Sequence, residues 1–312
     1  MSFPVEFPIV IAHRGASGYL PEHTLPAKAM AHAQGADYLE QDLVLTRDGV
    51  PIVLHDIHLD TVTDVATRYP SRRRSDGRFY AIDFLLSEIQ ELHVRERFDP
   101  ATGKPVFPNR FSAQINQFRI PTFEEELTFI QALNRSTGKK IGIYPEIKQP
   151  VFHRNHGADI TAAVMAILDR LTEANLPCYV QCFDPNELRR IREDFRSPLK
   201  LIQLLEHSDC ERMLQSPEIL QRELSQIAEY ANGIGPSLNG IFVNRHPTPL
   251  VAAAHEAGLE VHPWTYRADA LATGFTSFEE LHRASREVGV DGLFSDFPDR
   301  SLALVKALWP AL

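Results

Sequence analysis

The chain has 312 residues, which is enough for a large buried core in one domain or two. Its hydrophobic fraction of 44% is ordinary for a globular protein and argues against disorder. The net charge of −9 argues against bulk attraction to nucleic acid, and no apolar run approaches the length of a transmembrane span, so we expect no nucleic-acid partner and no stable membrane insertion.

The N-terminal segment and the cysteines bear on the compartment. Residues 1–6 have no basic n-region followed by a long apolar stretch. Cys178, Cys182 and Cys210 form no disulfide framework and no CxxC metal pair, which suits a reducing compartment. We expect a cytoplasmic protein, or a periplasmic one if a signal peptide has been removed, and a homodimer stays open.

A short buried strand comes first along the chain. The run Ile9–Ala12 is apolar and ends in His13, which is typical of a parallel strand that carries His13 at its carboxyl end. A helix follows, because Thr24 is a capping residue and Gly35 suits the helix end.

The next strand carries two carboxylates. Glu40 and Asp42 stand two residues apart, so they point to the same face. Asp48 and Gly49 form a tight-turn signal, and so short a connection predicts a hairpin rather than a parallel crossover. With these two residues at its centre, the hairpin would place Asp42 directly opposite His55.

Residues 57–120 break the alternation of strands and helices. The stretch is polar, rich in arginine and too long for an ordinary barrel loop. We expect an inserted segment that follows the His55 loop and packs over the mouth of the barrel. Its basic run, Arg72-Arg73-Arg74, is interpreted as a solvated loop, with contact to an anionic substrate as the lesser alternative.

Strands and helices alternate along the rest of the chain. Thr122 begins a helix through a capping box, and Asp184 begins another with a proline at the first helical position. Strands are expected near residues 9–13, 37–44, 141–147, 178–182, 200–204, 232–242, 260–264 and 291–295. In the sixth of these, both 232–235 and 240–243 qualify.

Eight strands with intervening helices predict an α/β protein with a (β/α)8 TIM-type barrel. A doubly wound open sheet is the alternative, but no GxGxxG turn follows the first strand. We expect a single barrel domain over residues 1–312, with the insertion at about 57–120.

Polar residues at the carboxyl ends of the strands make the predicted site, because barrel enzymes keep their active sites at that end. Glu146 and Lys148 share one face of their strand and enter the same mouth as His13, Glu40 and Asp42.

Glu40, Asp42 and Glu146 together offer three carboxylates, which favours calcium or magnesium over zinc. The alternative is that some of these acids only pair with Arg14 or Lys148.

His13 and His55 each end an apolar run beside a charged residue, which favours an acid/base pair over two satisfied interior histidines. Trp264 has two open roles: a core residue, or a platform that stacks on the carbon skeleton of a substrate.

An ordered set of motifs runs through the whole chain. They are His13-Arg14-Gly15, Pro21-Glu22, Glu40-Gln41-Asp42, Thr46-Arg47-Asp48-Gly49, His55-Asp56, Glu146-Ile147-Lys148, His262-Pro263-Trp264-Thr265 and Ser295-Asp296-Phe297-Pro298. Together they resemble the glycerophosphodiester phosphodiesterases, above all the bacterial periplasmic-type subgroup. One position departs: many relatives have asparagine where this chain has His23.

The resemblance implies a distorted barrel with a small subdomain after the hairpin of the second strand. It implies a divalent cation, calcium or magnesium, on the three acids named above. His13 and His55 match the general base and general acid positions, and Arg14 and Lys148 match positions that contact phosphate.

The expected reaction is metal-dependent hydrolysis of a small-molecule glycerophosphodiester, such as glycerophosphocholine or glycerophosphoethanolamine, to sn-glycerol 3-phosphate and an alcohol. The attacking group is either water or the glycerol 2-hydroxyl, and the second route passes through a cyclic phosphate. Two alternatives stay open: a lysophospholipase D or sphingomyelinase D-like phosphodiesterase, which needs room for acyl chains, and a non-catalytic binding protein on the same barrel.

Overall fold

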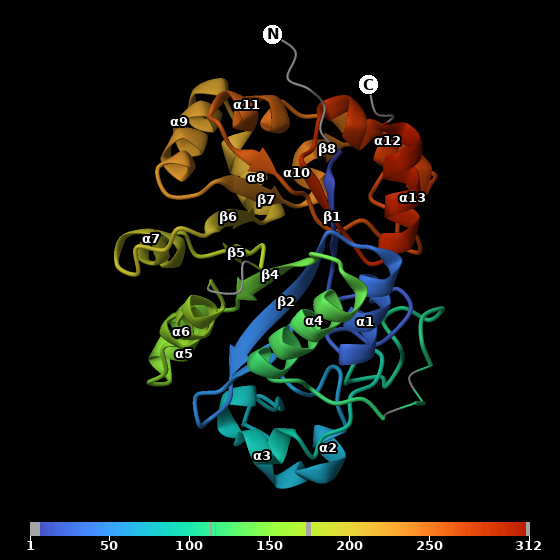
Figure 1. The fold of residues 1–312 in the computed structure, drawn as a ribbon, viewed down its shortest axis with the longest axis vertical. Helices are drawn as coiled ribbons and strands as arrows, with labels where there is room; N and C mark the ends of the chain where they lie inside the picture. Colours follow the sequence, from blue (N-terminus) through green and yellow to red (C-terminus); the bar gives the residue numbers. More distant parts are fainter. Residues whose placement is uncertain (1–6, 113, 116, 173–175, 310–312) are drawn as a thin grey trace. The chain divides into compact units, whose positions relative to one another are not determined.

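The computed structural model describes residues 7–112, 114–115, 117–172 and 176–309. The chain divides into two compact units (Figure 1). Unit 1 consists of Met1–His13, Gln34–Tyr38 and Cys178–Leu312. Unit 2 consists of Arg14–Ala33 and Leu39–Pro177. None of the helices in these described ranges combines the length and the apolarity that crossing a lipid bilayer requires.

Parallel strands form the centre of unit 1. They are β1 (Ile9–Ala12), β5 (Tyr179–Cys182), β6 (Lys200–Leu205), β7 (Gly233–Pro236), β10 (Glu260–Val261) and β11 (Gly292–Ser295). β5, β6, β7 and β10 pair in that order, and β11 pairs with β1. The segment that continues β10 joins β11, because the N–H of Tyr266 donates to the carbonyl of Phe294 at 2.8 Å. Six parallel strands of this unit thus form one connected run.

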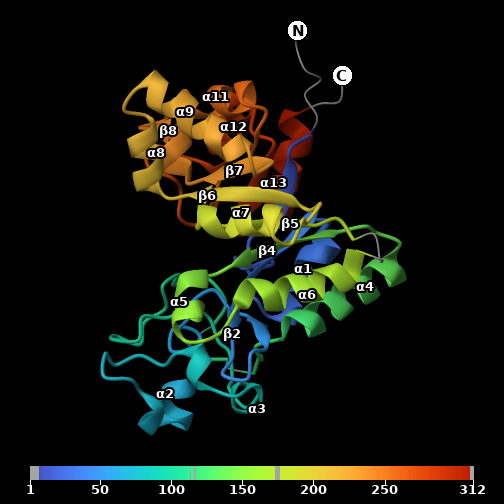
Figure 2. The same ribbon diagram turned by 90° about the vertical axis from the view of Figure 1, so that its left-hand side faces the viewer.

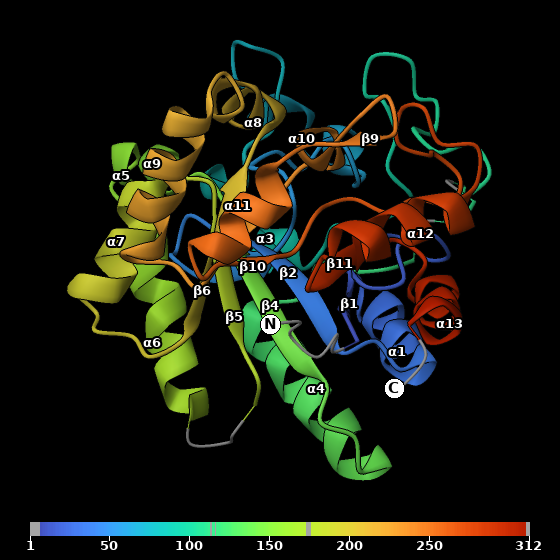
Figure 3. The same ribbon diagram turned by 90° about the horizontal axis from the view of Figure 1, so that it is seen from above.

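Helices follow these strands in unit 1. They are α7 (Pro185–Glu193), α8 (His207–Met213), α9 (Pro217–Ala228), α10 (Leu238–Ile241), α11 (Leu250–Glu256), α12 (Phe278–Val288) and α13 (Pro298–Leu308). A short hairpin joins β8 (Phe242–Val243) to β9 (His246–Pro247). Figure 3 shows α12 and α13 side by side, and α13 also packs on β1. The predicted start of α7 is confirmed, since the side chain of Asp184 accepts from the N–H of Asn186.

The ambiguous sixth strand is the first of its two candidates. β7 covers Gly233–Pro236, whereas residues 240–243 lie at the end of α10 and in β8. A Cβ at Gly233 would lie 2.5 Å from the carbonyl oxygen of Glu260, and one at Gly235 would lie 2.7 Å from the Leu204 side chain. Neighbouring groups approach so closely here that only glycine fits.

Unit 2 contains the other elements. Its strands are β2 (Tyr38–Leu45), β3 (Pro51–Val53) and β4 (Gly142–Ile147), with β4 beside β2 in the sheet. Its helices are α1 (Leu25–Gln34), α2 (Val65–Arg68), α3 (Leu86–Ile89), α4 (Phe123–Thr137), α5 (Pro150–Asn155) and α6 (Ile160–Thr172), with the 3-10 turns η1 (Pro70–Arg72) and η2 (Ala81–Asp83). Figure 2 shows α5 next to α6, which follows it.

The start signals of two helices in unit 2 are confirmed. Thr122 accepts from the N–H of Glu125 at 3.1 Å, and the Glu125 carboxylate accepts from the N–H of Thr122 at 2.7 Å. Thr24 accepts from the N–H of Ala27, and α1 ends before Gly35, whose φ is +93°.

The hairpin of β2 and β3 is confirmed, but its predicted register is wrong by one residue. Leu43 pairs with Val53, and the N–H of Leu54 donates to the carbonyl of Asp42, so Leu54 and not His55 lies opposite Asp42. The loop has three residues, 47–49, with Gly49 at φ +76°. A three-residue loop that ends in left-handed glycine shifts the pairing by one position relative to a two-residue turn.

Residues 57–120 have a hydrophobic core of their own. Phe79 and Phe84 lie at its centre and are almost fully buried. The same cluster includes Val44 and Ile52 of the hairpin. The segment therefore packs on the face of β2 and β3 that carries Val44 and Ile52, which on β2 is also the face of Glu40 and Asp42, and is not a disordered loop.

Candidate functional site

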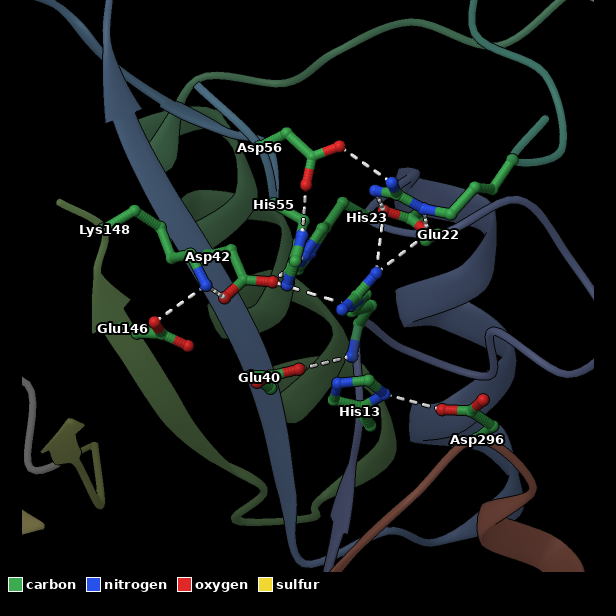
Figure 4. A network of polar contacts seen from close by, with 12 residues as sticks. His13, Glu22, His23, Glu40, Asp42, His55, Asp56, Glu146, Lys148 and Asp296 are labelled. Atoms are coloured by element: carbon green, nitrogen blue, oxygen red, sulfur yellow. Dashed lines mark hydrogen bonds and ion pairs between the residues drawn. The ribbon is translucent and has the colours of Figure 1, made fainter. Parts of the chain in front are cut away.

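Three buried carboxylates converge in unit 2. Glu40 and Asp42 lie on β2 and Glu146 lies on β4, and one oxygen of each lies within 4.8 Å of the others. Their exposed fractions are 3%, 1% and 5%. Figure 4 shows Lys148 beside them, with its Nζ 2.8 Å from Glu146 and 3.7 Å from Asp42. The structure thus brings four of the predicted site residues together.

The charges of these acids cannot all be balanced by Lys148 alone. Burial raises the pKa of Glu146 to about 8; the Lys148 ammonium opposes this shift and the Asp42 carboxylate adds to it. Burial, followed by the Asp42 charge, also raises the pKa of Glu40 well above its usual range. Burial would raise the pKa of Asp42 as well, but Lys148, His55 and a hydrogen bond outweigh it and hold that pKa well below the usual range.

The acidic cluster could therefore bind a metal ion. An additional positive charge would let all three carboxylates ionise, and Oδ1 of Asp42 is buried without a hydrogen-bond partner in the described part of the chain. A donor set of carboxylate oxygens suits a hard divalent cation.

The loop between β1 and α1 supplies Arg14. Its backbone N–H donates to the Glu40 carboxylate at 2.7 Å, and its guanidinium donates to both oxygens of Glu22 at 3.1 Å. Arg14 and Gly15 both have positive φ, 59° and 85°. A Cβ at Gly15 would lie 2.9 Å from the backbone of Ala27, so glycine is required where the loop touches α1.

His23, the position at which the motif pattern departs from the expected asparagine, is buried. Its Nε2–H donates to Oδ2 of Asp42 at 2.7 Å. Burial lowers the pKa of His23 to about 4, although the bond to Asp42 opposes the shift, so the ring is neutral near pH 7. A neutral imidazole N–H can orient a carboxylate as an asparagine amide N–H does, so the departure keeps a donor on Asp42.

His55 is oriented by a chain of charged groups. Its Nδ1–H donates to Asp56 at 2.5 Å, and the other Asp56 oxygen accepts from Arg97 and from Thr61, both at 2.7 Å. Arg97 also donates to both oxygens of Glu22, at 2.8 and 2.6 Å. The bond to Asp56 fixes the tautomer of His55, so its Nε2 carries a lone pair.

His13 has the same kind of partner in unit 1. Its Nδ1–H donates to Asp296 at 2.6 Å, as drawn in Figure 4, and Arg267 donates to the other Asp296 oxygen at 3.0 Å. Ala12 pairs with Ser295, and this register brings His13 and Asp296 to the same end of β1 and β11. The tautomer again leaves a lone pair on Nε2.

Trp264 also lies in unit 1 and is half-buried. Its indole N–H donates to the carbonyl of Gly235 at 2.8 Å, and Phe183 packs edge-on against it. The polar atom of the indole is thus satisfied by the barrel backbone, and the ring is held in one orientation.

Sequence reasoning missed three contributions to the site. Glu22 stands out in the sequence only as part of a motif, although in the structure it joins Arg14 to Arg97. Arg97 lies in the weakly periodic stretch and had no local signal. Asp56 directly follows His55, so that pair could have been recognised as an oriented imidazole.

Known proteins match this chain along most of its length. Residues 13–300 match the glycerophosphoryl diester phosphodiesterase family. A glycerophosphodiester phosphodiesterase of Haemophilus influenzae is 43% identical, and the match covers 96% of this chain and 90% of the relative. The chain belongs to the glycerophosphoryl diester phosphodiesterase family.

Two solved structures have the same fold. A candidate glycerophosphoryl diester phosphodiesterase of Silicibacter pomeroyi has a TM-score of 0.73 and 25% identity, over 96% of this chain and 94% of that one. A phosphodiesterase of Oleispira antarctica, solved with the product sn-glycerol-3-phosphate, has a TM-score of 0.67 and 22% identity, over 96% and 97%. The predicted (β/α)8 barrel is confirmed, and the chain is a phosphodiesterase enzyme of this family.

Proposed function

We propose that this enzyme hydrolyses small glycerophosphodiesters, such as glycerophosphocholine and glycerophosphoethanolamine, to sn-glycerol 3-phosphate and an alcohol, with calcium or magnesium as cofactor. The observation that carries the proposal is the buried cluster of Glu40, Asp42 and Glu146 with two cationic side chains at its edge. The structure of the Oleispira antarctica phosphodiesterase contains sn-glycerol-3-phosphate, which is the product proposed for this enzyme.

Glu40, Asp42 and Glu146 would hold the divalent cation. When bound, such a cation supplies Lewis-acid chemistry to a phosphate oxygen and a template for the glycerol hydroxyls. Arg14 and Lys148 lie against the same carboxylates, with Arg14 Nε 3.6 Å from Asp42. Their remaining donors would bind the phosphate, and the fork of Arg14 suits a phosphate edge.

The two histidines are proposed to move protons. Nε2 of His13 accepts the proton of the attacking hydroxyl, from water or from the glycerol 2-hydroxyl, while Asp296 stabilises the imidazolium that forms. Nε2 of His55 gives a proton to the leaving alcohol, and Asp56 orients the ring.

The acid role of His55 depends on the substrate. Burial, Arg14 and Lys148 together lower the pKa of His55 to about 3, so the ring alone is neutral near pH 7. A bound phosphodiester would offset the charges of Arg14 and Lys148 and raise this pKa. Proton uptake by His55 would then accompany substrate binding.

Two further proposals rest on family membership. Trp264, held by Gly235 through its N–H, would stack on the carbon skeleton of the substrate. Residues 1–312 would form a single barrel domain in which residues 57–120 are an inserted subdomain.

Metal removal tests the acidic cluster. We expect EDTA to abolish release of glycerol 3-phosphate from glycerophosphocholine, and calcium or magnesium to restore it. The ion should also raise the melting temperature, because a ligand at about 100 times its Kd stabilises a fold by about 2.7 kcal/mol. Glu146→Gln should lose this thermal response and Glu193→Gln, an exposed acid at the end of α7, should keep it. Full activity in EDTA would contradict metal dependence.

Substitution of the histidines tests the proton transfers. His13→Ala and His55→Ala should each lower kcat by about 10²–10⁴-fold, with unchanged melting temperatures. Exposed His246→Ala on β9 serves as the control. Phosphorus NMR of the products should show whether a cyclic phosphate forms, and lysophosphatidylcholine as a parallel substrate separates this reaction from lysophospholipase D activity. Near wild-type turnover in either variant would exclude its proposed role.

A further inference from the structure

A second group of cationic side chains lines a cleft in residues 57–120 of unit 2. The cleft has a volume of about 630 Å³ and shares no lining residue with the acidic cluster. Its lining includes Arg73, Arg78 and Arg95, with Asp60 and Asp64 as acids. This size lies within the range of small-molecule sites, about 300–1,000 Å³.

The structure separates the members of the Arg72-Arg73-Arg74 run. Arg72 donates to Glu88 at 2.8 Å, and Arg74 binds both oxygens of Asp83 at 2.7 Å. Arg73 is exposed, lies over the ring of Phe79 at 5.3 Å and has no carboxylate partner among the described residues. Of the three, Arg73 alone lines the cleft.

Arg95 is the second arginine of the cleft without an ion pair in the described part of the chain. Its guanidinium lies 3.7 Å above the ring of Phe98. Its Nε is buried and has no hydrogen-bond partner within the described ranges. A buried donor of this kind costs about 1–3 kcal/mol when nothing accepts from it.

Asp60 has an acceptor oxygen that receives no hydrogen bond from the described residues. One of its oxygens accepts from Arg78 at 2.7 Å, while the buried Oδ1 has no hydrogen-bond partner among the described residues. The other acid, Asp64, is engaged by Arg68 at 2.8 Å and by His93 at 3.0 Å. The cleft therefore combines two guanidinium groups without an ion pair among the described residues and one carboxylate, Asp60, with an oxygen that has no hydrogen-bond partner there.

We propose that the cleft is a second ligand site, separate from the catalytic centre, for a phosphate group that carries a neighbouring hydroxyl or ammonium donor. Arg73 and Arg95 bind the phosphate, and Asp60 accepts from the hydroxyl or ammonium. A bare anion is a poorer ligand, because Asp60 repels it without gaining a hydrogen bond. Glycerophosphate compounds have this chemistry, either free in solution or as the headgroup of a phospholipid.

Calorimetric titration of the full chain in EDTA tests the site, with sn-glycerol 3-phosphate and inorganic phosphate as probes. We expect Arg73→Gln combined with Arg95→Met to bind one equivalent of glycerol 3-phosphate fewer than the wild type. Methionine keeps the packing on Phe98, and melting curves verify the fold. The matched control is Arg74→Gln. Arg74 belongs to the same run, but Asp83 already neutralises it, so this variant should bind as many equivalents of glycerol 3-phosphate as the wild type.

A third variant tests the donor requirement. The wild-type cleft should prefer glycerol 3-phosphate over inorganic phosphate by about tenfold, and Asp60→Asn should abolish this preference. If the wild type and the double variant bind the same number of equivalents of glycerol 3-phosphate, the proposed site is wrong. If Arg74→Gln loses as much binding as the double variant, the binding is only general attraction between opposite charges. A preference that Asp60→Asn leaves unchanged overturns the role of Asp60.

Co-sedimentation with phosphatidylglycerol vesicles, compared with pure phosphatidylcholine vesicles, separates the two sources of the ligand. Binding that depends on Arg73 and Arg95 assigns the site to a lipid headgroup, whereas soluble binding without co-sedimentation assigns it to the free compound. Turnover of glycerophosphocholine by the double variant, measured with metal present, should equal that of the wild type. A failure of the second ligand site can therefore be distinguished from a failure of the proposed reaction.

Discussion

Carboxylates on Nδ1 determine what the two site histidines can do. Asp56 holds His55 and Asp296 holds His13, and each carboxylate is in turn held by an arginine. Asp56 stays ionised, because the hydrogen bond to His55 and the charge of Arg97 outweigh burial and lower its pKa. The orientation of His55 thus depends on Arg97, a residue that does not itself reach the acidic cluster.

Arg97 should act as a positioning residue. Arg97→Ala leaves Asp56 without its cation and Glu22 with Arg14 alone, so we expect kcat to fall by about 10–100-fold with little change in KM. Arg97→Lys should restore only part of kcat, because an ammonium cannot bind Glu22 with two parallel bonds. The acid limb of the pH profile should also move in Arg97→Ala.

The control for this prediction is Arg68→Ala. Arg68 of α2 forms its ion pair with Asp64, the residue before that helix, and its loss should leave kcat unchanged. A kcat for Arg97→Ala within twofold of the wild type would contradict the positioning role.

At the scale of elements, a buried polar network ties two helices to the strands that carry the acids. Lys28 of α1 is fully buried and donates to the backbone carbonyl of Glu40 and, at 2.7 Å, to Glu126 of α4. Gln41 of β2 donates to Glu126 at 2.9 Å and accepts from the N–H of Tyr144 of β4 at 3.1 Å. One face of β2 therefore presents Glu40 and Asp42 to the site, while Gln41 on the other face joins the strand to α4.

Removal of one member of this network should be more harmful than removal of both. Lys28→Met leaves the Glu126 carboxylate buried without its cation, and we expect a loss of about 3–5 kcal/mol in the free energy of unfolding. Lys28→Met with Glu126→Leu should recover most of that loss, because no uncompensated charge remains. Urea denaturation measures both.

Lys306→Met on the exposed side of α13 is the control and should change the free energy of unfolding little. A double variant as unstable as Lys28→Met would contradict this account.

At the scale of the whole molecule, buried neutral histidines make stability depend on pH. Burial lowers the pKa of both His262 and His282 to about 4, from the ordinary value of 6.5. In His282, Nδ1–H donates to the carbonyl of Phe278 at 2.8 Å, and Nε2 lies 3.1 Å from the hydroxyl oxygen of Ser301. Between pH 6.5 and pH 4 the unfolded chain therefore binds more protons than the folded chain.

Stability from these histidines should be complete above pH 6.5 and should decline as the pH falls from 6.5 towards 4. Each site should contribute about 1–2 kcal/mol to the decline between pH 7 and pH 5. Urea denaturation at both pH values, at a constant metal concentration, should show a shallower decline in His282→Gln than in the wild type. Exposed His246→Gln should keep the wild-type decline, and an equal decline in all three proteins would contradict the prediction.

Much of this protein follows from local pattern alone. The run Ile9–Ala12, the alternation of Glu40 and Asp42, the cap at Thr122 and the turn glycine Gly49 each express a backbone periodicity or a dihedral preference that neighbouring residues determine. The strand ends that carry His13 and the acids can therefore be predicted from the sequence.

Partner choice across long separations was decided only by the tertiary structure. Arg97 is 75 residues from Glu22, and nothing near it in sequence indicates that contact. The one-residue hairpin register and the choice between two candidates for β7 depended on a loop length and on a close approach of neighbouring strands. Asp83 pairs with Arg74 and Glu88 pairs with Arg72, so Arg73 between them has no carboxylate partner among the described residues. Such contacts arise when packing brings distant segments together, and that packing has no local signature in the chain.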